Sequence, residues 1–152
     1  MLPIDPELKD FLEGGVAAQA GTADPSGRPA VTNAWGPRVN GDGTVTVFFD
    51  TRRAGPALAN LALNPRIAVV FADPVSYRSV QLKGRWRSTS AVSEEDRAWV
   101  QRHRELYASA IVLVGDSPDS MRNMWGAEVT RVDFDVEAAF DQTPGPNAGL
   151  PL

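Results

Sequence analysis

Short apolar-rich stretches bounded by turn sequences fill most of the first 50 residues. The clearest is Thr44–Asp50 (TVTVFFD), in which β-branched and aromatic residues alternate with others as in a half-buried strand. Val16–Thr22 and Pro29–Trp35 precede it, and the turn sequences 24–27 (DPSG) and 40–43 (NGDG) separate the three. The pattern therefore predicts an antiparallel meander.

Three further stretches are expected to form strands. Ile67–Phe71 (IAVVF) is continuously apolar, which is typical of a strand buried on both faces. Tyr77–Ser88 is a longer strand in which Gly84 indicates a bulge, and Thr130–Phe140 is the last.

Two short helices are predicted in the first half of the chain. Asp5 and Pro6 have the residue types preferred at the N-cap and at the first helical position, and Gly14-Gly15 ends that helix. Residues 55–63 form the second helix, because Gly55-Pro56 opens it and Asn64-Pro65 stops it.

The third helix is the longest and carries the clearest amphipathic pattern. Ser93 is its N-cap, and Asp96 stands at capping-box spacing. Ser117-Pro118 opens a fourth helix that reaches Trp125. The apolar face of the third helix, at i, i+3 and i+4 spacing, comprises Trp99, His103, Leu106, Tyr107, Ala110 and Ile111.

These elements predict an α+β, mainly β protein: a six-stranded antiparallel split β-barrel with peripheral helices. Helices do not alternate regularly with strands, which disfavours a doubly wound parallel sheet. We see no repeat and no linker, and we expect residues 1–152 to form a single domain. The Pro- and Gly-rich tail, 143–152, has no pattern of regular structure.

Composition and charge narrow the class of protein. The chain is 43% hydrophobic and 22% charged, as in globular proteins. Its net charge of -4 argues against nucleic-acid binding. No apolar run is long enough to cross a membrane, and residues 1–10 do not resemble a signal peptide. We therefore expect a cytoplasmic protein that binds neither nucleic acid nor membrane.

Conventional catalytic groups are scarce. Cysteine is absent, so we expect no metal site. No nucleophile pair can be assigned around the single histidine, His103, which we expect to be a half-buried packing residue. Glu94, Glu95 and Asp96 lie in the first turn of a helix, where acids favour the macrodipole. The usual nucleotide-binding glycine motifs are missing. A protein of this kind can still be an enzyme if a cofactor supplies the chemistry.

One loop has the chemistry of an anion site. Thr51, Arg52 and Arg53 follow the third strand and precede the helix that begins near Pro56. Free amides at a helix N-terminus beside two arginines suit a phosphate group. An ordinary solvated loop explains the same residues equally well, and position alone leaves both readings open.

From Gly15 to Trp86 the chain carries a series of motifs in a characteristic order. A DPSGRP turn (24–29) is followed by FFDT (48–51), LALNPRIAVVF (61–71) and YRSVQLKGRW (77–86). In this order they resemble the pyridoxamine 5'-phosphate oxidase-like, FMN-binding split-barrel family. Asn33-Ala34-Trp35 is similar to an Asn-x-Trp sequence on the second strand of small bacterial FMN-binding members.

The resemblance implies that two barrels pair as a homodimer, with FMN in the groove between the subunits. Residues on the second strand line the flavin, the loop after the third strand holds its phosphate, and the long strand lies near the flavin of the partner subunit. The cofactor-binding residues implied in this way are Thr32, Asn33, Ala34, Trp35, Thr51, Arg52, Arg53, Gln81 and Lys83. No catalytic residue is implied.

The chain also departs from the family pattern. Many relatives have an Arg-Lys pair where this chain has Pro56 and Ala57, so Arg52 and Arg53 are the substitutes. Ser79 stands where relatives that oxidise pyridoxamine phosphate have Gln. The C-terminal substrate-binding Arg and His of those relatives are not recognisable, which disfavours vitamin B6 oxidation.

Several functions remain open at this point. The leading hypothesis is an FMN-dependent oxidoreductase of unknown small-molecule substrate, in which hydride transfer needs no histidine base. A variant uses the deazaflavin F420 in place of FMN. The alternatives are a non-catalytic flavin carrier or sensor and a barrel that binds no flavin.

Overall fold

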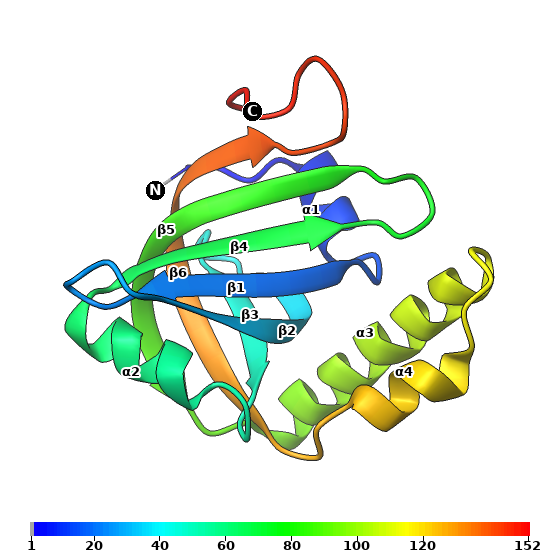
Figure 1. Cartoon of the computed structure of the whole chain (residues 1–152), viewed down its shortest axis with the longest axis horizontal. Helices are drawn as coiled ribbons and strands as arrows, with labels where there is room; N and C mark the ends of the chain where they lie inside the picture. Colours follow the sequence, from blue (N-terminus) through cyan, green and yellow to red (C-terminus); the bar gives the residue numbers. More distant parts are fainter. Residues whose placement is uncertain (1) are drawn as a thin grey trace.

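Six strands of the computed structural model, which describes residues 2–152, close into an antiparallel barrel (Figure 1). Around the barrel the order is β1-β2-β3-β6-β5-β4, and β4 returns to pair with β1. The prediction of a mainly β, six-stranded antiparallel barrel with peripheral helices is confirmed. The elements are α1 (Pro6–Leu12), β1 (Ala17–Ala23), β2 (Pro29–Val39), β3 (Val45–Asp50), α2 (Gly55–Leu63), β4 (Arg66–Ala72), β5 (Ser79–Ser90), α3 (Glu94–Val112), α4 (Pro118–Met124) and β6 (Val129–Asp141).

Alternation along each strand fills the barrel with apolar side chains. Phe49, Phe71, Phe134 and Leu82 are fully buried and come from four different strands. Burial of each such side chain contributes about 1.5–3 kcal/mol, so the core is the main source of stability. The opposite faces of the strands point out of the barrel, and it is there that the candidate site lies.

The predicted bulge at Gly84 is confirmed. The register between β5 and β6 shifts between Lys83 and Gly84. A β-carbon at Gly84 would overlap the backbone carbonyl of Asp135 on β6, so the two backbones come closer than any larger residue allows. The bulge helps the long strand curve around the barrel.

Two short helices close opposite ends of the barrel (Figure 1). Asp5 caps α1, since its Oδ1 accepts a hydrogen bond of 2.8 Å from the Leu8 amide, and Leu8 and Leu12 enter the core. Ala57 and Leu61 of α2 pack into the other end. Both helices begin and end close to the residues predicted for them.

The long helix α3 docks against the outside of β2. Its capping box between Ser93 and Asp96 is present as predicted. At Gly36 the strand bulges with φ +53°, and the Trp99 indole donates a 3.0 Å hydrogen bond to the Gly36 carbonyl. Pairing of β2 with β3 resumes after the bulge, so β2 continues to Val39, beyond the predicted end at Trp35.

His103 ties α3 to two other segments and is 3% exposed. The Gly36 amide donates to its Nδ1 at 3.0 Å, so the proton sits on Nε2, which donates to the Val16 carbonyl at 2.9 Å. Burial lowers the pKa of His103 to about 4, so the ring stays neutral near neutral pH. Its predicted packing role fits this geometry, and it is more deeply buried than expected.

Three local predictions are wrong in detail. The strand around Ile67–Phe71 is buried on one face only, because its other face lies on the outside of the barrel. Tyr77 is not in β5 but in the preceding turn, with φ +61°, because the chain reverses there between β4 and β5.

The third error concerns the packed face of α3. Leu106 is 38% exposed, whereas Val100, Arg104 and Ala108 are buried. His103 and Ile111 of the predicted stripe are buried as expected, but the packed face extends to Val100, Arg104 and Ala108 and leaves Leu106 outside it.

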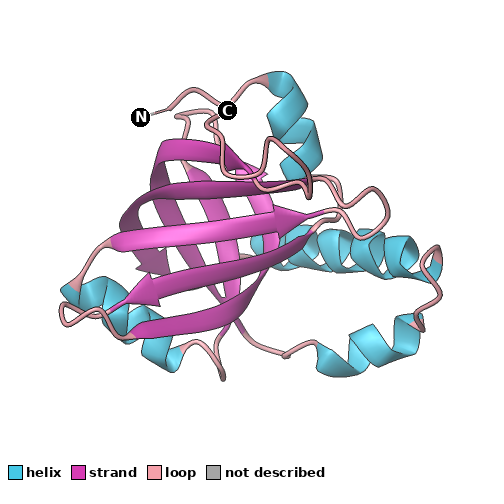
Figure 2. Cartoon of the chain, turned by 45° about the horizontal axis from the view of Figure 1, so that its top comes forward, coloured by secondary structure: helices cyan, strands magenta, loops and turns pink. Residues whose placement is uncertain are grey.

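The C-terminal half of α3 and the whole of α4 stand beside the barrel as a helical hairpin (Figure 2). No residue of α4 is buried, and an ion pair of 3.0 Å between Arg122 and Glu105 joins it to α3. The tail folds back on β6, where Pro151 bridges Phe140. Among the described residues, no helix is long and apolar enough to span a bilayer.

The buried neutral His103 predicts a specific dependence of stability on pH. The pKa of His103 is about 4 in the folded state, against 6.5 when exposed. Between these two pH values the unfolded chain binds a proton at His103 that the folded chain does not bind. The free energy of unfolding should therefore fall by about 3 kcal/mol as the pH drops from 6.5 towards 4. Urea unfolding of the protein and of His103→Gln at pH 7, 5.5 and 4.5 checks this. A variant that keeps the full slope between pH 6.5 and 4.5 would contradict it.

Candidate functional site

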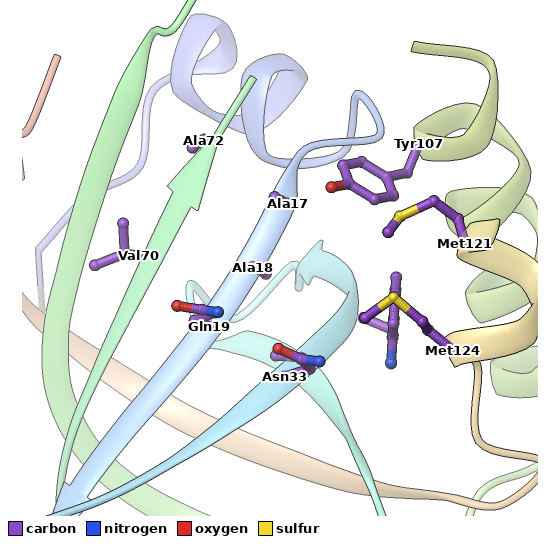
Figure 3. Close-up of a pocket in the computed structure, with 11 residues that line it drawn as sticks. Ala17, Ala18, Gln19, Asn33, Val70, Ala72, Tyr107, Met121 and Met124 are labelled. Atoms are coloured by element: carbon purple, nitrogen blue, oxygen red, sulfur yellow. The ribbon is translucent and has the colours of Figure 1, made fainter. Parts of the chain in front are cut away.

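A cleft of about 260 Å³ lies between the outer face of the barrel and the α3–α4 hairpin (Figure 3). Its barrel wall comes from β1, β2 and β4, and its other wall from the two helices. The barrel wall is formed by Ala17, Ala18, Gln19, Asn33, Ala34, Trp35, Val70 and Ala72. The helix wall is formed by Tyr107, Met121 and Met124.

The barrel wall is flat and carries two amide side chains. Gln19 and Asn33 are directly opposite each other in the β1–β2 register, and Figure 3 shows them side by side. Neither side-chain amide is hydrogen-bonded to another residue within 2–152, so both are free to bind a ligand. The same row continues across the sheet through Val70 of β4 to Gln81 of β5.

The helix wall is apolar apart from one hydroxyl. Met121 and Met124 are one turn apart on α4 and share its cleft-facing side (Figure 3). Burial, and secondarily the Asp116 carboxylate, raises the pKa of Tyr107 above its ordinary value. The phenol therefore stays protonated and can donate a hydrogen bond.

Trp35, at the base of the cleft, is held by aromatic and cationic neighbours. Its ring makes edge contacts at 6.3 Å with His103, Tyr107 and Trp125. The Arg104 guanidinium carbon lies 4.9 Å from the Trp35 ring centre and 5.5 Å from that of Trp125. These contacts hold the indole in one orientation.

Arg104 is 7% exposed, and its Nε and one terminal nitrogen have no hydrogen-bond partner. Burial lowers its pKa, an effect that the nearby Asp50 carboxylate opposes. Sequence reasoning missed Arg104 because an arginine on a helix is usually solvated. It also missed the cleft residues Gln19, Met121 and Met124, although the one-turn spacing of the two methionines was a readable signal.

The loop between β3 and α2 presents the predicted anion-binding groups at the surface. Thr51, Arg52 and Arg53 are all exposed, and Arg53 Nε is 3.9 Å from Asp50 Oδ2. The N-terminus of α2 has no side-chain cap, and a β-carbon at Gly55 would meet no atom within 4 Å. Uncapped amides, two arginines and open space therefore occur together.

This loop adjoins the cleft through the segment 125–128. Trp125 contacts Trp35 at the cleft, and Gly126 packs against the Asp50 carboxylate, where a β-carbon would lie 2.5 Å from it. The Thr51 amide donates a 3.0 Å hydrogen bond to the Glu128 carbonyl. The charged loop and the uncharged cleft are thus neighbouring parts of one surface.

The structure brings some of the predicted cofactor residues together and separates others. Asn33, Ala34 and Trp35 line the cleft. Thr32, 5% exposed, alternates with Asn33 and Trp35 and so has its side chain on the interior side of β2. Gln81 belongs to the row of Asn33 but does not line the cleft.

Lys83 lies further along β5, outside the cleft. Its ammonium is 4.9 Å from the Phe140 ring centre, and it borders a second groove over β1, β2, β4 and β5. A single chain therefore does not bring Lys83 to the residues that line the cleft.

Comparison with known proteins gives one family. A family model described as pyridoxamine 5'-phosphate oxidase matches residues 4–135. No curated protein matches the chain.

Several solved structures share the fold at low sequence identity. HupZ of Group A Streptococcus has a TM-score of 0.57 at 19% identity, and the match covers 96% of this chain and 99% of HupZ. An F420 reductase has a TM-score of 0.56 at 19% identity and 90% and 98% coverage. An FMN-binding protein of Syntrophomonas wolfei has a TM-score of 0.52 at 9% identity and 88% and 82% coverage. These likenesses show the fold alone.

Proposed function

This chain belongs to the pyridoxamine 5'-phosphate oxidase family, and we propose that it is an FMN-binding oxidoreductase. The observation that carries the proposal is the adjacency of the charged β3–α2 loop to the uncharged cleft beside Trp35. FMN has the matching chemistry, since an anionic phosphate is joined to a flat, largely apolar ring. The fold is shared with a protein named for FMN binding.

The phosphate would be held by Thr51, Arg52 and Arg53 together with the amides of α2. The residues present fit this role, because both arginines are exposed and there is open space at Gly55. Pro56 removes one amide donor from the first turn of α2, so the arginines carry more of the binding.

The ring would lie on the outer face of β2, against Asn33 and Trp35. Trp35 is 8% exposed and is held in place by its aromatic and cationic neighbours, so the part of it that reaches the cleft needs little further ordering on binding. Asn33 offers an unpaired amide to the polar edge of the ring.

When bound, a flavin accepts and donates electrons or hydride, which none of the side chains here can do. The chain contributes orientation through Asn33 and Trp35 and a neutral hydrogen-bond donor through Tyr107. No lining residue is a carboxylate, histidine or lysine. The site is therefore suited to hydride transfer rather than to proton abstraction by a general base.

F420 is a second candidate cofactor. The likeness to an F420 reductase, which covers 98% of that protein, favours it. The same loop and cleft would serve, because a deazaflavin also joins an anionic tail to a flat ring. Retention of bound FMN without turnover by any donor would instead indicate a carrier or sensor.

We further propose that the outer face of the barrel is the interface of a homodimer. Val31 on β2 is 68% exposed there. Its cross-strand partner Gly21, and Ala68 beyond it on β4, are small enough for another surface to approach closely. In a dimer this face would be covered, and Gln81 and Lys83 would lie at the subunit boundary. Cytoplasmic localisation remains an expectation from the sequence.

Replacement of both loop arginines should weaken FMN binding. We expect about one FMN per chain, and a roughly 100-fold lower affinity in Arg52→Ala/Arg53→Ala, because two charge-assisted hydrogen bonds are lost. Quenching of flavin fluorescence during titration measures both quantities. Arg97→Ala/Arg102→Ala, which removes the same charge from exposed positions on α3, should bind FMN like the parent protein. Equal losses of FMN affinity in the two double variants, or no loss in either, would refute the phosphate assignment. If the parent protein binds F420 more tightly than FMN, the deazaflavin is the better candidate cofactor.

Introduction of a charge at Val31 should dissociate the dimer. Light scattering is expected to give twice the 16.4 kDa chain mass for the parent protein and close to the single-chain mass for Val31→Glu. Leu63→Glu is the matched control, because Leu63 is also 68% exposed but lies on α2. A parent protein of single-chain mass would count against both the dimer and an intersubunit flavin site.

A further inference from the structure

We propose that the helix side of the cleft, next to the proposed flavin position at Asn33 and Trp35, binds the substrate, and that the substrate is an uncharged, planar, mainly apolar molecule with one polar edge. The inference rests on the proposed function, since this molecule is the one that would react with the flavin. It adds a substrate class to the site and places that substrate on the helix side of the cleft, against Tyr107, Met121 and Met124.

The first argument is the charge of the lining. All the residues around the cleft are neutral, and Gln19, Asn33, Tyr107 and Trp35 are its only polar side chains. A phosphate or carboxylate placed here would lose its hydration without gaining an ionic partner, which is costly. Arg104 does not supply that partner, because it lies behind the Trp35 ring and is not part of the lining.

The second argument is the shape and stiffness of the two walls. The barrel side is a flat sheet surface with alanine side chains at 17 and 72. The helix side carries Met121 and Met124, whose flexible thioethers adapt to a ring edge or face. A volume of about 260 Å³ is just below the usual range for ligand pockets, so the cleft admits only a small ligand.

The third argument is the position of the polar groups. Gln19 presents an unpaired amide on the sheet beside Asn33, whose own amide is assigned to the flavin, and the Tyr107 hydroxyl is directed towards β1 from the opposite wall (Figure 3). A ligand with a carbonyl or hydroxyl on one edge can pair with these groups while its apolar remainder contacts the methionines. The Gln19 amide and the Tyr107 hydroxyl therefore set the orientation of the ligand, and the apolar wall supplies binding energy.

A pair of fluorescent probes that differ by one charged group tests the substrate class. N-phenyl-1-naphthylamine is uncharged, and 8-anilino-1-naphthalenesulfonate has the same ring system with a sulfonate. Titration of the purified protein should show saturable binding of the uncharged probe at about one per chain, and at least about tenfold weaker binding of the sulfonate. Equal binding of the two, or no binding of the uncharged probe, would overturn the proposal.

Charged variants of the hairpin locate the bound probe. Met124→Glu places a carboxylate in the cleft on a helix with no buried residue, so the fold should be retained, and it should weaken the uncharged probe at least about tenfold. Leu113→Glu, at a position that is 75% exposed at the tip of the same hairpin, should bind the probe like the parent protein. If the two variants behave alike, the probe is not in the cleft and the proposal fails.

Addition of FMN separates this inference from the proposed function. Retention of the uncharged probe alongside bound FMN supports a substrate pocket next to the cofactor. Displacement of the probe by FMN at one-to-one stoichiometry would show that the cleft holds the flavin ring itself and would overturn the substrate assignment. If FMN does not bind but the uncharged probe still binds selectively, the flavin proposal is refuted, whereas the ligand class proposed for the cleft is still supported.

Discussion

Closure of the barrel through the β4–β1 pairing is the constraint on which the rest of the structure depends. It forces each strand to present one set of side chains to the core and the other to the outside. Because the registers of β5, β4, β1 and β2 are coupled by this closure, Gln81, Val70, Gln19 and Asn33 fall in one row on the outer face. A shift of one residue in any of these pairings would turn those side chains into the core.

The docking of α3 on β2 is the second determinant of the site. The bulge at Gly36 leaves its amide and carbonyl for His103 and Trp99, and these two hydrogen bonds hold the helix against the strand. The same docking brings Tyr107 and, through the hairpin, the methionines of α4 opposite the sheet. A neutral buried histidine thus has a structural role that positions the wall of the cleft without entering it.

The surface next to this helix divides into a charged part and an uncharged part. The β3–α2 loop contributes arginines and free amides, whereas the cleft contributes aromatic rings, thioethers and amides. The segment 125–128 joins the two parts by packing Trp125 on Trp35 and Gly126 on Asp50. Such a division suits a ligand with an anionic tail and a neutral ring, and it follows from where two distant parts of the chain meet.

The sequence by itself determined the strands, the helix caps, the Gly84 bulge and the family, because turn residues, capping residues and motif order are local properties. It also indicated Asn33 and Trp35 through a short motif. Only the tertiary structure decided which face of α3 packs, that Arg104 is buried between two tryptophans, and that Gln19, Met121 and Met124 meet across a cleft. These facts depend on the closure of the barrel and the angle of the helical hairpin, which bring together residues that are about 100 positions apart and that no local pattern connects.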